Sequence, residues 1–303
     1  MRAPSNLRSD HNLGVIAVLV AITAWGMTSV IIKSIDMNAI SIAFWRFLVY
    51  AAMLTAWMRV RGGRFSFRLL WTAAPGGLLL SGDVFLFFTA IKVTNVVNAT
   101  TIGALQPLVI AVFATRLFGE HISRREIAAA LVAIAGVVVV ITQSAGTPEW
   151  SGAGDLAAVG ALFCWSGYFV VAKRMSDTLT PIQFTTGTAW WVGITALPVG
   201  LLFAQDMSPP PTSEWPALIL LLLVGGVLGH SLMNWGIPRV PLWLSSTLTL
   251  MIPVLASLAA WVFLDEPLTV VQLVAMGVVV AALAVIVTAQ STPARLQPVD
   301  VVS

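Results

Sequence analysis

Runs of about 20 mostly apolar residues recur from one end of this chain to the other, and they constrain its fold more than any other feature. A helix needs about 20 apolar residues to cross the hydrocarbon core of a bilayer, because each residue advances it by only about 1.5 Å. The runs therefore predict an all-α polytopic membrane protein of about ten transmembrane helices. The expected spans are 13–32, 39–58, 69–91, 95–115, 126–143, 153–172, 181–203, 215–237, 241–264 and 270–289.

The low charge content excludes a soluble fold of this size. Only 10% of the residues are charged and 58% are hydrophobic, whereas about 25% of an ordinary soluble domain is charged. The first apolar run is longer than the core of a signal peptide, so we expect a retained first helix. Cys164 is the only cysteine, which excludes an intramolecular disulfide and a thiolate cluster. We therefore expect no metal and no cofactor, and the net charge of +3 gives no indication of nucleic-acid binding.

Lysine and arginine are distributed unevenly between the two sides of the predicted bundle. With the N-terminus in the cytoplasm, 13 of the 16 basic residues fall in cytoplasmic segments, and only Lys33 and Lys92 fall outside. The remaining one, Arg46, lies inside a span. Because cytoplasmic loops carry an excess of Lys and Arg, we expect an inner (plasma) membrane protein. Its N-terminal tail 1–12 and C-terminal tail 290–303 would both be cytoplasmic.

The chain also contains an internal repeat of two five-span halves, 13–143 and 153–289. Since five is an odd number, the second half would enter the membrane upside down. Inverted repeats of this kind are a common architecture of secondary transporters. Offsets of 140 and 146 relate the matching positions, which are Trp25 with Trp165, Lys33 with Lys173, Pro107 with Pro253, and Glu120 with Glu266.

At these positions the chain resembles the drug/metabolite transporter superfamily, in its EamA-domain branch. The first half carries AITAWGMTSVIIK, AFWRF and AIKVTNVVNATTIGALQPLVIAVFATRLFGE, and the second carries CWSGYFVVAK and SSTLTLMIPVLASLAAWVFLDEPL. The resemblance covers residues 13–289. It implies ten helices and transport of small metabolites, often amino acids and often as export, along a path lined by spans 1, 3, 4, 6, 8 and 9. The second half departs from the pattern at Arg239-Val240-Pro241, where the first has Lys92-Val93-Thr94.

The predicted function is therefore secondary export of a small metabolite by alternating access between the two repeats. The expected partners are a small-molecule substrate, the lipid bilayer and, as a candidate coupling ion, the proton. A monomer and a homodimer both remain open. The alternative is a non-transport intramembrane enzyme or scaffold. The sequence lacks a P-loop and an HExxH motif, and Ser231 follows His230 directly, so their side chains would diverge on a helix.

Ionisable residues inside a bilayer are costly, which makes Arg46, Asp83 and His230 functional candidates. Arg46 and Asp83 are expected at similar depths, roughly 10–12 Å from the outer surface, so they could form a structural ion pair. Asp83 could instead bind a substrate amine or carry a proton. His230 shares a predicted helix face with Gly226 and Asn234, and it is either a hydrogen-bonded core histidine or a proton-coupling group.

Aromatic and neutral polar residues complete the predicted substrate path. Trp25 and Trp165 are repeat equivalents near the middle of the bilayer and would either pack helices together or bind a solute. The further pathway candidates are Tyr168, Asn98, Gln106 and Asn234. Pro107 and Pro253 remove backbone hydrogen bonds and should kink their helices. Glu120 and Glu266 are interpreted as helix caps or inter-helix anchors.

Overall fold

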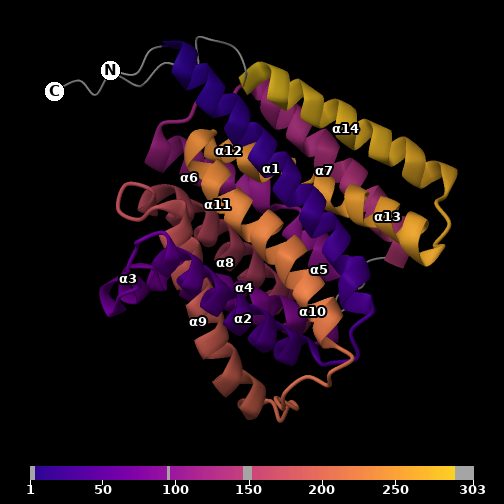
Figure 1. Ribbon diagram of the computed structural model, residues 1–303. Coiled ribbons are helices and arrows are strands. Elements are labelled where there is room, and N and C mark those ends of the chain that lie inside the picture. Colours follow the sequence, from indigo (N-terminus) through magenta and orange to yellow (C-terminus); the bar gives the residue numbers. More distant parts are fainter. Residues whose placement is uncertain (1–3, 94–95, 146–151, 291–303) are drawn as a thin grey trace.

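The computed structural model describes residues 4–93, 96–145 and 152–290, and the regular elements of these ranges are helices (Figure 1). Residues 1–3 and 291–303 of the two predicted tails lie outside the described part. The helix that starts the chain begins at Pro4, well before its predicted apolar run, because hydropathy marks only the part of a helix that lies in lipid.

Apart from the start of α1, the helices of both halves begin and end within a few residues of the predicted spans. Several spans are divided into shorter helical pieces. The first half contains α1 (Pro4–Lys33), α2 (Ala39–Val60), α3 (Phe67–Thr72), α4 (Ala74–Val93), α5 (Val96–Gly103), α6 (Gln106–Phe118) and α7 (Arg124–Ala145). The second half contains α8 (Ala153–Met175), α9 (Pro181–Leu202), α10 (Trp215–Leu221), the π-helical η1 (Leu222–Ser231), α11 (Leu232–Gly236), the 3₁₀ turn η2 (Ile237–Arg239), α12 (Leu242–Leu248), α13 (Met251–Leu264) and α14 (Val270–Gln290).

Within the described residues, eight helical stretches are long and apolar enough to cross a membrane. The α4 and α9 helices occupy the two other predicted spans. The α9 helix contains a polar run, QFTTGT, and in α4 the stretch Ala74–Phe87 is apolar but shorter than a full span. The chain is thus an all-helical, polytopic membrane protein, and the count of ten spans remains a prediction.

Local sequence explains where several helices start and stop. The Asn38 side chain caps α2 by accepting a hydrogen bond from the Ser41 amide at 2.9 Å. A reciprocal capping box between Thr180 and Gln183 starts α9, and it satisfies amides that have no partner within the helix. Gly119 ends α6 with a φ of 63°, a backbone conformation that glycine adopts without steric cost.

The two proline-containing spans are broken in the same way. Residues 104–105 separate α5 from α6, and residues 249–250 separate α12 from α13. Pro107 and Pro253 follow these breaks within a few residues. A proline lacks the amide hydrogen that would bond to the carbonyl four residues earlier, and its ring clashes with that carbonyl. Each helix is therefore interrupted just before its proline.

The strongest helix pairings join one half of the chain to the other. The α4 helix packs on α8, α2 on α9, α7 on α14, and α1 on both α13 and η1 (Figure 1). The packing pattern is preserved when each element is replaced by its counterpart in the other half. For example, α1 packs on η1 as α8 packs on α4. Most inter-helix packing therefore lies along a seam between the halves, and the hydrophobic core extends across it.

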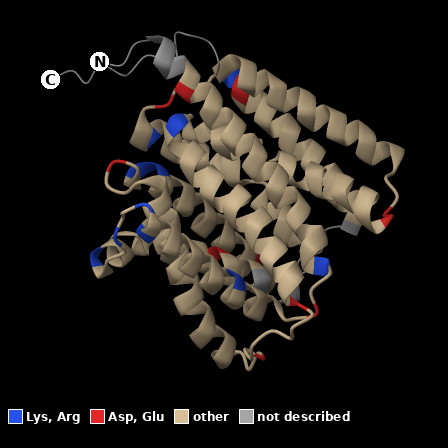
Figure 2. Ribbon diagram, viewed as in Figure 1, with Lys and Arg blue, Asp and Glu red and all other residues tan. Residues whose placement is uncertain are grey.

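Lysines and arginines are concentrated at one end of the bundle, whereas aspartates and glutamates lie at both ends (Figure 2). The end that holds the N-terminus and the arginine-rich turn after α2 is here called the basic end. The other end, formed by residues 34–38, 204–214 and 265–269, is called the opposite end. The arginines and lysines around the basic end are Arg59, Arg61, Arg64, Arg68, Arg116, Arg124, Arg125, Lys173, Arg174 and Arg239.

Candidate functional site

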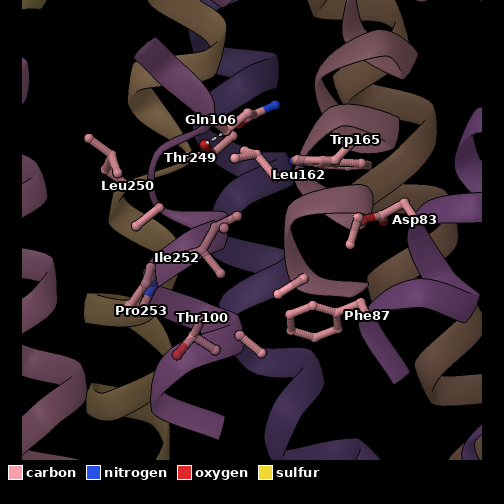
Figure 3. Close-up of a pocket in the computed structure, with 15 residues that line it drawn as sticks. Asp83, Phe87, Thr100, Gln106, Leu162, Trp165, Thr249, Leu250, Ile252 and Pro253 are labelled. Atoms are coloured by element: carbon pink, nitrogen blue, oxygen red, sulfur yellow. Dashed lines mark hydrogen bonds between the residues drawn. The ribbon is translucent and has the colours of Figure 1, made fainter. Parts of the chain in front are cut away.

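A cavity of about 250 Å³ lies on the seam between the two halves, and we call it the seam pocket. Both broken spans and the α4 and α8 helices contribute to it (Figure 3). Its lining is mainly apolar, with a few polar groups. The lining residues are Asp83, Phe87, Ala99, Thr100, Gly103, Ala104, Gln106, Ala158, Ala161, Leu162, Trp165, Thr249, Leu250, Ile252 and Pro253.

The two helix breaks meet at the seam pocket. Thr249, in the second break, donates a hydrogen bond of 3.0 Å to the side-chain oxygen of Gln106, which starts α6 after the first break (Figure 3). The side-chain nitrogen of Gln106 is buried and has no hydrogen-bond partner. Irregular backbone at membrane depth is tolerated where it lines a cavity, so the two breaks and the free amide form a polar floor.

Asp83 supplies a carboxylate to the wall of the seam pocket, beside Trp165 and Phe87 (Figure 3). Among the described residues it has no hydrogen-bond or ion-pair partner. The predicted pair with Arg46 is not formed: among the described residues no ion pair joins the two side chains, and the Arg46 guanidinium lies over the Phe47 ring instead. Equal depth in the membrane fixes only the position of a residue along its helix and not the direction of its side chain. The α2 helix packs chiefly on α9 and α4 on α8, and this packing directs the two side chains to different surroundings.

Trp25 and Trp165, the two repeat equivalents, contact each other on the seam. Their rings lie 5.4 Å apart in an edge-on arrangement, a favoured geometry for aromatic pairs. Trp165 also lines the seam pocket and stacks on Tyr168 at 5.6 Å. Trp25 packs against His230 at 5.2 Å. The tryptophan pair therefore separates the seam pocket from a second group of polar residues on α2 and η1.

The remaining predicted site residues form hydrogen-bonded contacts between helices. Tyr168 and Asn234 are buried and bonded to each other at 2.9 Å, and Asn234 also donates to Thr185 at 3.0 Å. Asn98 donates to Asp155 at 2.8 Å. Neither Thr185 nor Asp155 is evident as a partner in the sequence, because the bonded residues lie far apart along the chain.

The predicted polar stripe of Gly226, His230 and Asn234 is divided among different neighbours. The Gly226 carbonyl accepts a hydrogen bond from Tyr50 at 2.8 Å. His230 faces Trp25 and Phe47, whereas Asn234 faces α8 and α9. The cause is the π-helical turn of η1, which changes the angular spacing of residues from that of an α-helix.

A partly buried ion-pair network closes the basic end of the seam. Lys173 lies 2.9 Å from Glu120, and it donates a hydrogen bond of 2.7 Å to the Val240 carbonyl. Glu120 also accepts hydrogen bonds from the Leu242 and Trp243 amides at 2.6 and 2.9 Å. These are the first amides of α12, so Glu120 acts as the helix cap and inter-helix anchor that the sequence suggests.

The fold and pocket define a class: a polytopic helical membrane protein with a cavity between two halves of similar design. In the described chain no cluster of three or more metal-ligating side chains is found. The chain matches the EamA-like transporter family over residues 12–142 and again over residues 152–288. It belongs to this family.

Individual relatives agree with the family assignment. The aromatic amino acid exporter YddG of Ancylobacter novellus is 32% identical over 62% of this chain and 65% of its own length. The threonine/homoserine exporter RhtA of Escherichia coli is 25% identical over 68% of this chain and 67% of its own. An uncharacterized Bacillus subtilis transporter, YyaM, is 29% identical over 64% and 65%. The matches with YyaM and YddG thus span slightly under two thirds of those proteins.

A solved crystal structure shares the fold. It superposes with a TM-score of 0.78, covers 94% of this chain and 99% of the other, and is 24% identical in sequence. The helical arrangement in Figure 1 therefore has a close structural counterpart.

Proposed function

We propose that this chain is a secondary carrier that exports small metabolites, such as amino acids, by alternating access. The observation that carries the proposal is the seam pocket, where both broken helices and an unpaired carboxylate meet between the two halves. Transporters built from inverted repeats bind substrate at the repeat interface near the bilayer midplane, between discontinuous helices. The twofold match to one family and the exchangeable packing pattern support inverted repeats here.

The orientation follows from the charges. The basic end carries most of the lysines and arginines, so it faces the cytoplasm by the positive-inside rule. Both termini are then cytoplasmic in a cell (inner) membrane protein. Phe87 and Thr100 line the seam pocket close to the end of α4 and the start of α5, whereas the Lys173–Glu120 network closes the basic end. The structure then corresponds to an outward-facing state.

Asp83 is the proposed ligand for a positively charged group of the solute. A carboxylate without a partner in a mainly apolar pocket favours a cation or a proton. Two of the relatives are named as exporters of amino acids, whose α-amine would satisfy Asp83. Proton coupling through Asp83 or His230 belongs to the same proposal.

A transport role is favoured over an intramembrane enzyme. Ser231, the hydroxyl next to His230 in sequence, is bonded to Tyr50 at 2.6 Å rather than to the histidine. A nucleophile needs its base within hydrogen-bond reach, and this pair does not provide one.

The test is a flux panel in proteoliposomes with the purified protein. The panel includes L-phenylalanine, L-threonine, L-homoserine and neutral analogues without the amine. We expect saturable flux of at least one amine-bearing solute. Asp83→Asn should weaken its apparent affinity by about 10–100-fold, the loss of one hydrogen bond to a charged group. Asp36→Asn, at an exposed carboxylate, is the matched control and should have no effect.

Absence of saturable flux for every solute, in a preparation that remains folded, would refute the carrier proposal. Normal flux in Asp83→Asn would leave the carrier intact but exclude Asp83 as the ligand. Adding a protonophore separates coupling from facilitated exchange. A gradient of solute that survives this treatment would exclude proton coupling.

A further inference from the structure

The π-helical segment η1 presents a face of glycines to α1 and α2. Side chains from those helices rest directly on its backbone. A Cβ atom added to Gly225 would lie 3.0 Å from a terminal nitrogen of Arg46, and one added to Gly229 would lie within clashing distance of the Trp25 indole. The Tyr50 ring packs on Gly226 in the same way. π-Helical turns occur frequently at functional sites, so this face of η1 is a candidate ligand site.

We propose that Arg46 and His230 form a subsite that binds a carboxylate group of the transported solute. The proposal rests on the carrier function proposed above and adds a second recognition point to it. Asp83 would meet a positive group on one side of the Trp25–Trp165 pair. Arg46 would meet a negative group on the other, at a different stage of transport, because the amine and the carboxylate of an α-amino acid share one carbon and cannot reach both sides of the pair at once.

The Arg46 guanidinium has no anionic partner among the described residues. It lies in the α2 span, partly exposed, with its Nε buried and without a hydrogen bond. Its contacts are the Phe47 ring, 4.9 Å from the guanidinium carbon, and the Gly225 backbone. Within the described chain no carboxylate is paired with it. A charge in a span is expensive unless it is paired, so a ligand carboxylate would supply the missing partner.

His230 is also buried, with an exposed fraction of 8%. Its Nδ1 has no hydrogen-bond partner among the described residues. Its ring lies 5.5 Å from Phe47 and 5.2 Å from Trp25. Phe47 therefore contacts both Arg46 and His230, which places the two polar groups around one aromatic ring. An unsatisfied buried nitrogen is costly, and one oxygen of a carboxylate would satisfy it when this nitrogen carries its proton.

The hydrogen-bond donors of Arg46 and His230 favour a planar anion as the ligand. A guanidinium offers parallel N–H donors that match the two oxygens of a carboxylate. The nearby indole nitrogen of Trp25 is already bonded to the Gly225 carbonyl at 3.2 Å, and the hydroxyl of Tyr50 to Gly226. These two bonds hold the walls of the subsite in place and leave Arg46 and His230 as its free donors.

The test measures binding without transport. Benzoate and benzamide have nearly the same shape, and only benzoate carries the carboxylate. Thermal unfolding of the purified protein in detergent is followed over a concentration series of each, because a ligand that binds the folded state raises its stability. We expect benzoate to stabilise the wild-type protein and benzamide to have little effect.

The variants assign this effect to the subsite. Arg46→Gln should weaken the apparent Kd for benzoate by at least about tenfold, and His230→Gln by about threefold or more. Gly225→Ala should have a similar effect to His230→Gln, because the added methyl group displaces the guanidinium. The matched controls are Arg59→Gln, an exposed arginine of the same helix, and Gly277→Ala, where an added Cβ meets no atom within 4 Å. Both controls should bind benzoate as the wild type does.

Equal stabilisation by benzoate and benzamide would overturn the subsite, as would an unchanged benzoate affinity in Arg46→Gln. If Arg46→Gln does not fold, His230→Gln and Gly225→Ala decide, and benzoate affinity within twofold of wild type in both overturns the proposal. The flux panel keeps the two proposals apart. A wild-type protein that transports a panel solute but ignores benzoate retains its proposed function and loses only the subsite.

Discussion

Two lysine–glutamate pairs of the described chain are formed by residues at matching positions of the two halves. Their surroundings in the structure differ. Each joins a lysine of one half to a glutamate of the other, Lys173 to Glu120 at 2.9 Å and Lys33 to Glu266 at 2.6 Å. The side chains of the first pair are 17% and 13% exposed, and those of the second are 59% and 52% exposed. The first pair also bonds three backbone groups. Among the described residues, the second bonds none.

Matching charges therefore lie at both ends of the seam, but only the basic end is held by backbone hydrogen bonds as well. An exposed ion pair contributes about 0–1 kcal/mol. Removing one partner from a buried pair costs about 3–5 kcal/mol, because the other charge is left without compensation. The basic end should therefore hold the two halves together more strongly than the opposite end. In an alternating-access cycle, opening the basic end would then require breaking the stronger contact.

The largest effect is expected from removing Glu120. Glu120→Ala leaves Lys173 unpaired and uncaps α12, and we expect a loss of about 2–4 kcal/mol in stability. Glu266→Ala, the repeat-equivalent control, should cost under about 1 kcal/mol. Thermal unfolding of the two variants side by side in the same detergent provides the measurement. Equal losses would show that the burial difference between the pairs has no energetic consequence.

Removing Glu120 should also change which end of the seam is open. The reporter is Thr100→Cys, at the seam pocket, in a Cys164→Ala background, labelled from outside with a membrane-impermeant maleimide. Weakening the basic end should shift the population towards the state that opens there and reduce labelling by about threefold or more. Faster labelling in Glu120→Ala than in its parent would contradict the assigned direction of opening.

A smaller effect is expected from exchanging the charges within each pair. At the opposite end, Lys33→Glu with Glu266→Lys recreates an exposed ion pair and should restore stability to within about 0.5 kcal/mol of wild type. At the basic end, Lys173→Glu with Glu120→Lys cannot restore it, because a lysine has no acceptor for the Leu242 and Trp243 amides. Unfolding midpoints of the two double variants measure this. Full rescue at both ends would mean that the backbone bonds of Glu120 contribute little.

The contrast between the two pairs also shows how far the sequence predicts this molecule. Apolar runs predict the helices closely, as the expected span 153–172 and the observed α8 show, because hydropathy measures contact with lipid. The helix breaks near Pro107 and Pro253 were predicted by covalent chemistry. The burial of the Lys173 pair was not, since it depends on the Val240 carbonyl and the first amides of α12, which approach the pair only in the folded chain.

The site was predicted less completely than the fold. Asp83, Gln106 and Trp165 do line the seam pocket, and their intramembrane polarity or their repeat position marked them. Arg46 and Asp83 were expected to pair from depth alone, and the rotation of each helix about its axis separates them. The π-helical geometry of η1, which directs His230 away from Asn234, has no signal in the periodicity because η1 spans only ten residues.

The smallest expected effect is the response of the exposed pair to salt. Lys33→Met should lower stability by at most about 1 kcal/mol at low ionic strength. That difference from wild type should vanish at 1 M sodium chloride, where the screening length falls to about 3 Å. The Lys173→Met difference should persist, because partly buried charges are screened much less. Unfolding midpoints of wild type and both variants at low and high salt measure this, and a Lys33→Met difference that survives high salt would show that the opposite end is locked as well.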